Sequence, residues 1–246
     1  MENPFSFAVL LRCVTLNFPV MELQLVVTED GSHTFFNPAL NEHYHSINGA
    51  IQESRHIFIK HGFQAAVIRK QEMSILEVGF GTGLNTLLTF KENCQRHLKI
   101  RYVAIEPEPL GEEHLKLLNY PGKIGSCDER VTFFKIHTTP WDFPYYLSED
   151  FILFKLHEKI QEVLLGEGKF DLVYFDAFSP EVQPEMWQAD VFGKIFTAMV
   201  PGGLLLTYSA KGEVRRTLKH CGFSVESVPG PPGKREITRA QKPPAA

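Results

Sequence analysis

Three glycines and an acidic residue in front of them form the first stretch of this chain that could bind a ligand. In "LEVGFGTGLN" (76–85), Glu77 precedes Gly79, Gly81 and Gly83, and apolar runs flank the group. The G-x-G-x-G spacing differs from the G-x-G-x-x-G of dinucleotide binders, and no Gly-Lys-Ser/Thr follows to make a phosphate loop. Glycines at the end of a strand let a ligand approach the backbone. The stretch therefore predicts a site for a nucleoside that carries an amino-acid tail.

A second carboxylate, Glu106, ends the next apolar run, "KIRYVAIEP" (99–107). At the end of a second strand, a carboxylate can accept hydrogen bonds from both ribose hydroxyls of an adenosine, which implies a ribose without a 2′-phosphate. A structural glycine turn would explain the glycines alone, whereas Glu106 favours a ligand. We predict S-adenosylmethionine as the cofactor. The predicted cofactor-binding residues are Glu77, Gly79, Phe80, Gly81, Thr82, Gly83, Asn85, Glu106, Asp142 and Asp176.

The stretch "DAFSP" (176–180) provides the candidate catalytic group. It follows an apolar run, so Asp176 is expected at the same sheet edge as the glycines. An amine that attacks a sulfonium methyl needs acceptors that hold its N–H groups and direct its lone pair at the methyl carbon. We predict Asp176 and Phe178 as catalytic residues, with Asp176 orienting the amine and then accepting its proton, and Phe178 lining the pocket. The alternative for Asp176 is a helix N-cap.

The elements that must position these residues follow from the alternation of short Val/Ile/Phe-rich runs with longer amphipathic ones. This pattern predicts an α/β fold, a Rossmann-like, mostly parallel seven-stranded sheet that ends in an antiparallel hairpin. The strands are expected at 74–80, 99–107, 130–137, 170–178, 204–210, 223–228 and 235–240. The helices between them are expected at 85–98, 110–120, 151–165, 185–200 and 212–222.

The region before the glycine stretch is predicted to be a small appendage. Runs at 23–27 and 33–36 suggest a β-hairpin, and a helix is expected from about 49 to 60. We divide the chain into an upstream extension (1–20), this hairpin-and-helix appendage (21–62) and the main domain (63–246). The extension lacks the basic start and the cleavage site of a signal peptide.

Composition excludes several classes of protein. The four cysteines are widely spaced without a CxxC pair, which argues against a zinc site and a disulfide scaffold and favours a reducing cytoplasm. No window reaches the roughly 18 apolar residues of a membrane span. His43 and His45 have H-x-H spacing but no cysteine partner, so we predict no metal and a surface or pocket-lid role for them.

The net charge of −4 gives no overall nucleic-acid signature, although the C-terminal part is basic. From Leu205 onward there are eight Lys or Arg against three Glu, or +5, which leaves −9 for the rest. A solvated helix face and a phosphate-binding surface both explain this excess. The candidate nucleic-acid contacts are Arg215, Arg216, Lys234 and Arg235.

Several motifs together resemble the methyltransferase domain of the MnmC family over about residues 21–240. They are "LEVGFGTGLNTLLT", "FDLVYFDAFSPEVQPEMWQADVFGKI", "PGGLLLTYSAKGEVRRTLKHCGFSV" and "GPPGKREITRA". The resemblance implies a class I, S-adenosylmethionine-dependent methyltransferase that converts the 5-aminomethyl group of a wobble 2-thiouridine in tRNA to 5-methylaminomethyl. It matches the "GFGTG" loop and Glu106 to the cofactor site, and "DAFSP" with Trp187 to the catalytic edge. Because bifunctional members also contain a flavin-dependent oxidase domain, a second enzyme or a different precursor pathway is expected to supply the free amine here.

Two features leave alternatives open. Many class I methyltransferases place an acidic residue just after the third strand, where this chain has "KIHTTPWDF"; Asp142, with Trp141 as a stacking face, is the nearest candidate for the adenine pocket. The "FDLVYFDAFSP" stretch also resembles spermidine-synthase-like aminopropyltransferases. A non-catalytic module that binds S-adenosylmethionine or tRNA is the alternative from another class.

Overall fold

The central element is an eight-stranded, mostly parallel sheet. A computed structural model describes residues 22–244 except positions 69 and 126, so the predicted extension over 1–20 lies outside the described residues. The strand order is β10-β11-β9-β8-β4-β5-β7-β6. Their bounds are β4 (Glu72–Val78), β5 (Lys99–Ile105), β6 (Pro144–Ser148), β7 (Phe151–Leu156), β8 (Phe170–Phe175), β9 (Met199–Thr207), β10 (Ser224–Pro229) and β11 (Glu236–Gln241). The five strands from β9 to β7 are parallel, and β10 and β11 form the predicted antiparallel hairpin.

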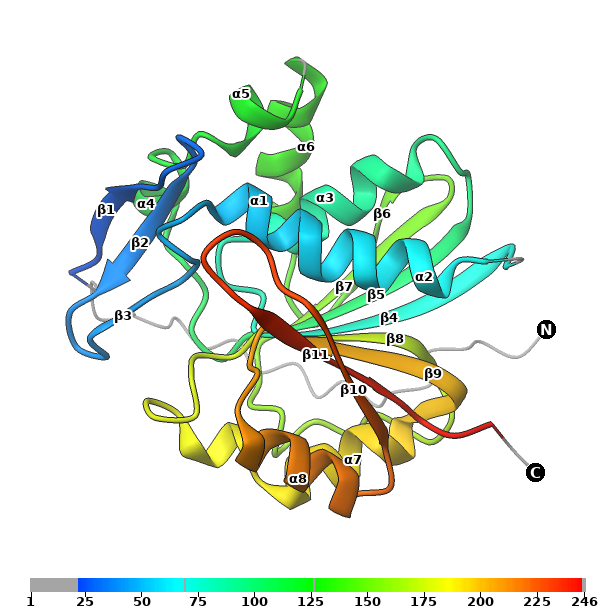
Figure 1. The fold of residues 1–246 in the computed structure, drawn as a ribbon. Helices are drawn as coiled ribbons and strands as arrows, with labels where there is room; N and C mark the ends of the chain where they lie inside the picture. Colours follow the sequence, from blue (N-terminus) through cyan, green and yellow to red (C-terminus); the bar gives the residue numbers. More distant parts are fainter. Residues whose placement is uncertain (1–21, 69, 126, 245–246) are drawn as a thin grey trace.

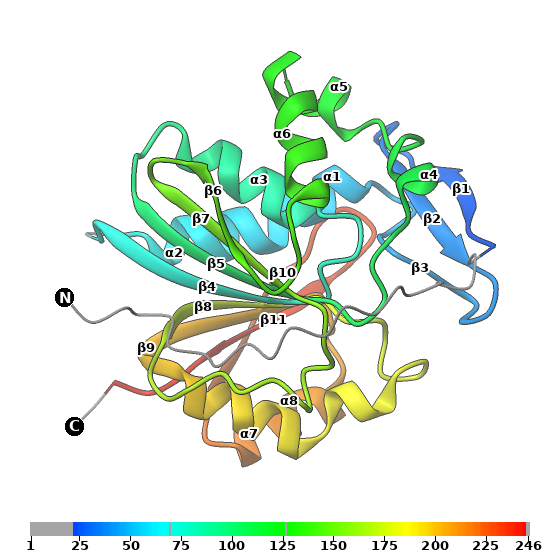
Figure 2. The same ribbon diagram turned by 180° about the vertical axis from the view of Figure 1, so that it is seen from behind.

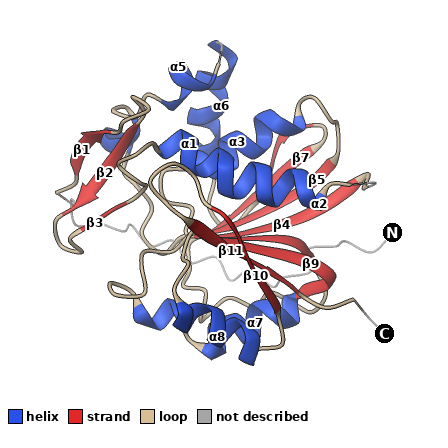
Figure 3. Cartoon of the chain, in the orientation of Figure 1, coloured by secondary structure: helices blue, strands red, loops and turns tan. Residues whose placement is uncertain are grey.

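Helices cover both faces of this sheet (Figure 1). One face carries the helical run α1 (Ala50–Ser54), η1 (Arg55–Phe63) and α2 (Gln64–Ala66), together with α3 (Leu84–Asn93). The other face carries α7 (Ala189–Ala198) and α8 (Gly212–His220), as Figure 3 also shows. Two separate apolar cores result, one on each face. This is the layered architecture that the alternating pattern predicts.

Two sequence predictions in the middle of the chain were wrong. Residues 130–137, expected as the third strand, belong to helix α6 (Cys127–Thr138). Phe133 and Ile136 are buried there while Val131 is exposed, which is a helical rather than an alternating period. The aromatic and β-branched residues had suggested a strand, and packing of one helical face overrides that preference.

The third parallel strand is instead β7, inside the segment 151–165 that was expected to be a helix. Phe151, Leu153 and Lys155 are buried in alternation, and the strand pairs in parallel with β5. Beyond it, β6 adds an antiparallel edge strand that the sequence did not predict. The expected helix over 110–120 is reduced to α4 (Glu112–Leu115), and α5 (Tyr120–Ile124) follows it.

The N-terminal part forms a small antiparallel sheet beside the carboxyl ends of the parallel strands. It contains β1 (Gln24–Val27), β2 (His33–Asn37) and β3 (Glu42–His43), and the β1–β2 hairpin is as predicted. Figure 2 shows this sheet next to α4 and α5. The helix that follows continues to Ala66 through the π-helical segment η1. It therefore crosses residue 62, where we placed the end of the appendage. Within the described part of the chain, no helix is long and apolar enough to cross a membrane.

Candidate functional site

A cavity of about 710 Å³ lies at the carboxyl edge of the large sheet. Its glycine-loop half is lined by residues 79–82, 106–108 and 159–161. Its outer half is lined by residues 42–47, Glu53, Tyr208 and Lys234. Asp176, Ala177 and Phe178 also line the cavity and contact both halves. An open parallel sheet commonly binds its ligand at this edge.

The glycine loop is fixed between two strand ends. The backbone N–H groups of Gly79 and Phe80 donate to the Ile105 carbonyl at the end of β5, at 3.0 and 3.2 Å. Gly79 has φ +90°, and a Cβ on it would lie 2.5 Å from the backbone oxygen of Asp176. Only glycine can therefore bring β4 this close to the end of β8. The first predicted glycine is a structural requirement of the site.

Glu106 faces the glycine loop from the end of β5. Its two carboxylate oxygens accept hydrogen bonds from the backbone N–H groups of Gly81 and Glu108, both at 2.9 Å. Burial raises the pKa of Glu106 to about 7. Each oxygen keeps a second lone pair, so the carboxylate can still accept hydrogen bonds from a vicinal diol.

Two residues that the sequence analysis did not assign, the partly buried His137 and the buried Lys155, support the glycine loop. The His137 side chain is hydrogen-bonded to the Thr82 carbonyl at 3.1 Å, and the Lys155 ammonium donates to the His137 carbonyl at 2.6 Å. Burial lowers the pKa of His137 to about 3 and that of Lys155 to about 8. The sequence pattern predicts a strand over 130–137, and a strand there does not place His137 beside the glycine loop.

Asp176 lies at the centre of the cavity wall. One of its carboxylate oxygens accepts a hydrogen bond from the Asn85 amide at 2.8 Å. The pKa of Asp176 is raised to about 7, mainly by burial and also by the nearby Glu53, while Asn85 and Lys234 lower it. No helix begins at Asp176, since the next one, η2 (Pro184–Trp187), starts eight positions later. The N-cap alternative is therefore excluded, and Asp176 is free to bind a ligand.

Phe178 lines the cavity, as predicted for a wall residue. Its ring meets the Tyr44 ring edge-on, with centroids 5.0 Å apart. Its carbonyl accepts a hydrogen bond from the Trp187 indole at 2.8 Å, so Trp187 holds the turn from below rather than contacting the cavity. The "DAFSP" turn thus presents one acid and one ring.

Several predicted cofactor contacts lie behind the cavity wall. Glu77 is a fully buried residue of β4 that faces α3, and Asn85 donates a hydrogen bond to Asp176 from α3. At Gly83, a Cβ would lie 2.7 Å from His137, so this glycine packs against the supporting helix. None of the three is among the cavity-lining residues. Their placement argues against direct cofactor contact.

Asp142 also lies away from the cavity. Its backbone N–H donates to the Lys155 carbonyl at 2.7 Å, and its carboxylate accepts from the His157 N–H at 3.2 Å. The Trp141 ring covers the Lys155 ammonium, 4.5 Å from its centroid. With the third strand reassigned to β7, the residues that follow it and line the cavity are 159–161. Asp142 was selected with 130–137 as the third strand, and its adenine-pocket role stays a prediction.

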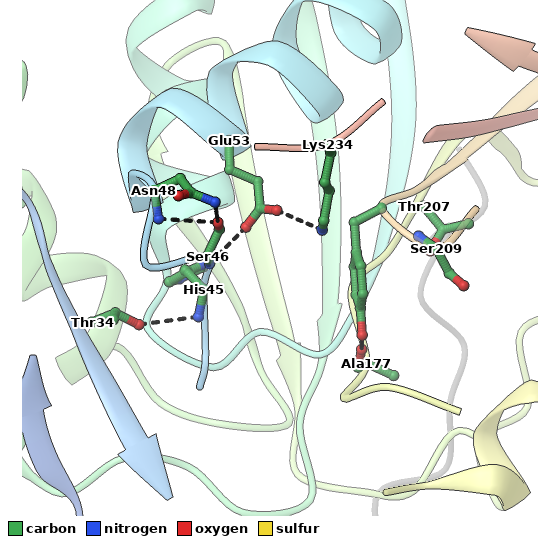
Figure 4. Close-up of polar contacts among 10 residues, drawn as sticks. Thr34, His45, Ser46, Asn48, Glu53, Ala177, Thr207, Ser209 and Lys234 are labelled. Carbon is green, nitrogen blue, oxygen red and sulfur yellow. Dashed lines mark hydrogen bonds and ion pairs between the residues drawn. The ribbon is translucent and has the colours of Figure 1, made fainter. Parts of the chain in front are cut away.

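The outer half contains an ion pair inside the cavity. Figure 4 shows the Glu53 and Lys234 side chains pointing toward each other, and their charged atoms are 2.7 Å apart. The Lys234 ammonium also lies 4.3 Å from the centroid of the Tyr208 ring. Glu53 accepts a further hydrogen bond from the Ser46 backbone N–H at 2.9 Å. Lys234, expected as an outward phosphate contact, is therefore a cavity residue.

The other predicted nucleic-acid contacts separate into two kinds. Arg215 bonds to Thr238 and Glu236 and thereby ties α8 to the β10–β11 hairpin. Arg216 and Arg235 are exposed. Arg235 directly follows the cavity residue Lys234 in the hairpin loop, but it is not among the residues that line the cavity.

Residues 42–46 of the segment "NEHYHS" line the outer half, and the pocket-lid role of His43 and His45 stays a prediction. The His45 ring is hydrogen-bonded to the Thr82 hydroxyl at 2.6 Å, and burial lowers its pKa to about 4. Neutral His45 thus joins the N-terminal segment to the glycine loop. Among the residues that the structure describes, no group of three or more His, Cys, Asp or Glu side chains is arranged to hold a metal ion.

The polar groups of the glycine-loop half fit S-adenosylmethionine. Glu106 is the acceptor for a ribose diol, and the Gly79–Gly81 backbone permits close approach of a ligand. A large, partly apolar cavity with a few convergent polar groups is typical of a small-molecule site. Asp176 beside that site can hold the N–H groups of an acceptor amine.

Comparisons with known proteins agree with this geometry. A sequence profile described as S-adenosyl-L-methionine-dependent methyltransferase matches residues 145–243. The tRNA 5-methylaminomethyl-2-thiouridine biosynthesis bifunctional protein MnmC of Aromatoleum aromaticum is 30% identical over 231 residues, which are 91% of this chain and 36% of that protein. The protein of the same name from Ralstonia nicotianae is 29% identical over 224 residues, 85% of this chain and 33% of its own length.

A solved structure extends the comparison to the fold. The crystal structure of MNMC2 from Aquifex aeolicus is 28% identical and superposes with a TM-score of 0.70, covering 91% of this chain and 73% of that one. The chain spans about a third of the length of the curated bifunctional relatives.

Proposed function

Because this chain belongs to the S-adenosyl-L-methionine-dependent methyltransferases, in the family that includes the methyltransferase part of MnmC, we propose that it methylates the 5-aminomethyl nitrogen of a wobble uridine in tRNA. The product is a 5-methylaminomethyl group, with 2-thiouridine as the expected base. The observation that carries this proposal is the position of Asp176 between a cofactor-type half and an acidic outer half of one cavity.

S-adenosylmethionine supplies a methyl group on a positively charged sulfur. In the proposed step, the amine nitrogen forms the new bond to the methyl carbon as the bond from sulfur to that carbon breaks. The nitrogen must be neutral and aligned, so its N–H groups need fixed acceptors. We assign this role to the Asp176 carboxylate, one oxygen of which is fixed by Asn85.

The proton balance of the reaction also involves Asp176. A primary alkylamine arrives mostly as ammonium at neutral pH and must lose one proton before transfer. With a pKa of about 7, Asp176 is substantially ionised at neutral pH and can accept that proton. After methyl transfer, the methylated nitrogen carries a positive charge, which it loses by releasing a second proton to water.

The outer half has the charge and shape for an ammonium on a flat base. Glu42, Glu53 and Asp176 line the cavity, with Lys234 as the cation paired to Glu53. The Tyr44 and Phe178 rings lie edge-on at one side. Acidic groups concentrate a cationic amine, and aromatic rings provide surfaces for a nucleobase.

The tRNA contact is proposed for the exposed arginines, Arg235 next to the cavity residue Lys234 and Arg216 on α8. Contacts of this kind bind phosphates without reading sequence, and the affinity they give falls as salt rises. A separate enzyme or domain that supplies the free aminomethyl group is part of this proposal, since methylation needs that amine.

The test is nucleoside mass spectrometry of tRNA that carries 5-aminomethyl-2-thiouridine, after incubation with the protein and S-adenosylmethionine. We expect a gain of one methylene on that nucleoside, dependent on the cofactor and lost in Asp176→Asn. If cofactor binding is intact by calorimetry and the nucleoside is unchanged, the tRNA proposal is wrong.

The same assay separates the two alternatives. A spermidine-synthase-like enzyme would transfer an aminopropyl group from decarboxylated S-adenosylmethionine to a polyamine, which mass spectrometry detects as a different product. A non-catalytic module would bind cofactor and tRNA without any product, in both the natural protein and Asp176→Asn.

A further inference from the structure

Glu77 is a buried acid to which the proposed reaction assigns no role. It is the second-last residue of β4, just before the glycine loop, and it has no exposed surface. One carboxylate oxygen accepts hydrogen bonds from the Thr86 hydroxyl at 2.8 Å and the Tyr102 hydroxyl at 2.9 Å. The other oxygen, Oε1, is buried without a partner.

Asn85 also has one buried polar atom without a hydrogen-bond partner. Its Nδ2 donates to Asp176 at 2.8 Å, while its Oδ1 is also buried without a partner. The Glu77 and Asn85 side chains are close enough for a hydrogen bond, which lowers the pKa of Glu77 against the larger rise caused by burial. Two acceptors cannot satisfy one another unless a proton lies between them, and buried polar atoms are rarely left unpaired.

We propose that Glu77 is a neutral carboxylic acid whose Oε1 proton is donated to Asn85 Oδ1, which makes Glu77 and Asn85 positioning residues for Asp176. A single proton then satisfies both unpaired atoms. It also fixes the orientation of the Asn85 amide, because Oδ1 must face Glu77 and Nδ2 must face Asp176.

The surroundings of Glu77 favour the neutral form. The titratable groups that face it are Tyr102 from β5, Tyr174 from β8 and Asp176 at the end of β8, none of them a cation. The pKa of Glu77 is raised to about 8: burial is the main cause and Asp176 contributes, while the hydrogen bonds with Thr86, Tyr102 and Asn85 oppose the rise. An ionised Glu77 would place a second negative charge behind Asp176 and hinder its ionisation.

The consequence for catalysis rests on the proposed function. With Asn85 fixed, one Asp176 oxygen is held from behind and the other is left for the substrate amine. If Asn85 were free to turn, its Oδ1 would face the Asp176 carboxylate and repel it. Glu77 therefore acts through Asn85, without touching the substrate.

The experiment compares Glu77→Gln with Glu77→Ala, using Glu72→Gln, an exposed glutamate of the same strand, as the control. Glutamine reproduces the neutral acid, because its oxygen accepts from Thr86 and Tyr102 and its amide donates to Asn85. We expect Glu77→Ala to lower kcat for methyl transfer by about 30-fold or more, which is the size of effect expected for a misplaced catalytic group. Glu77→Gln should restore most of that loss, with S-adenosylmethionine affinity similar in all variants. A Glu77→Gln enzyme as slow as Glu77→Ala would overturn the proposal.

A second readout needs no activity, so it tests the proton even if the tRNA substrate is wrong. The pKa of Glu77 is about 8 in the folded protein, against a usual value near 4.5. The folded state therefore keeps a proton that the unfolded state releases, and this contribution to stability is lost as pH rises from about 5 to 8. Relative to Glu77→Gln, the unfolding constant of the natural protein should rise by roughly 400-fold over that interval in urea titrations. A ratio that does not change with pH would mean that Glu77 is ionised in the fold, and the proposal would fail.

Discussion

The two halves of the cavity are built in different ways. The glycine-loop half comes from adjacent strand ends, where short hydrogen bonds from the loop to Ile105 and Glu106 fix its shape. The outer half combines the N-terminal segment 42–47 with Glu53 from α1 and Lys234 from the last hairpin, which are far apart in sequence. The first half fits a cofactor common to many enzymes, and the second is the half that we propose to recognise the substrate. Cofactor and substrate recognition should therefore respond to different substitutions.

The largest expected effect is in the glycine-loop half. Gly79→Ala would place a Cβ 2.5 Å from the Asp176 carbonyl at φ +90°. We expect at least 100-fold weaker S-adenosylmethionine binding by calorimetry and a loss of about 3 kcal/mol in unfolding free energy. Gly202→Ala is the matched control, since Gly202 has φ +81° and no atom within 4 Å of a Cβ. It should cost about 1 kcal/mol and leave cofactor binding intact. Equal effects in both would show that backbone strain alone matters.

The second prediction concerns the pH dependence of cofactor binding. Glu106 must be ionised to accept two ribose hydroxyls, and its pKa of about 7 lies above the usual value. Affinity for S-adenosylmethionine should fall about tenfold from pH 8 to pH 6 as Glu106 gains a proton. Glu106→Gln should bind weakly with no such slope, as calorimetry at several pH values can show. A natural protein with constant affinity would remove Glu106 from the cofactor site.

The ion pair of the outer half should change the rate profile in opposite directions. Lys234 lowers the pKa of Asp176, and Glu53 raises it. The rate should rise with pH as Asp176 ionises, so Lys234→Gln should move this rise to higher pH and Glu53→Gln to lower pH. Shifts of several-fold in kcat/KM at pH 7 are expected for a partly exposed pair. Shifts in the same direction would show that the pair only supports the fold.

The smallest effect is expected at the exposed Arg235. Arg235→Glu should weaken tRNA binding about threefold to tenfold and reduce its salt dependence, with cofactor affinity unchanged. Lys99→Glu is a suitable control, because Lys99 is exposed at the start of β5, on the opposite edge of the sheet. Filter binding at two salt concentrations measures both variants. Equal losses in the two variants would argue for a general charge effect.

The sequence predicted the glycine-loop half because its motif is local. Gly79, Glu106 and Asp176 each end a strand, and parallel strands end at a common edge. The fold class and both terminal hairpins could be predicted from periodicity for the same reason. Glu77 and Asn85 could not be separated from the cavity residues, since a strand or helix end does not reveal which side chains face inward.

The outer half could not be predicted, because its residues meet only in three dimensions. Lys234 carries a charge typical of an exposed hairpin loop, and nothing local indicates Glu53 as its partner. His137 was missed for a different reason: the aromatic residues of its segment favoured a strand, whereas Phe133 and Ile136 pack as one face of a helix. Both failures concern long-range packing, which sequence patterns do not encode.

The most direct test of the central claim is to measure cofactor affinity and single-turnover methyl transfer in Asp176→Asn with the same aminomethyl tRNA. If Asp176 joins the two halves by holding the acceptor amine, S-adenosylmethionine should bind within about threefold of the natural protein while the transfer rate falls by at least about 100-fold. Unchanged transfer would contradict the account, and so would a loss of rate explained entirely by lost cofactor binding.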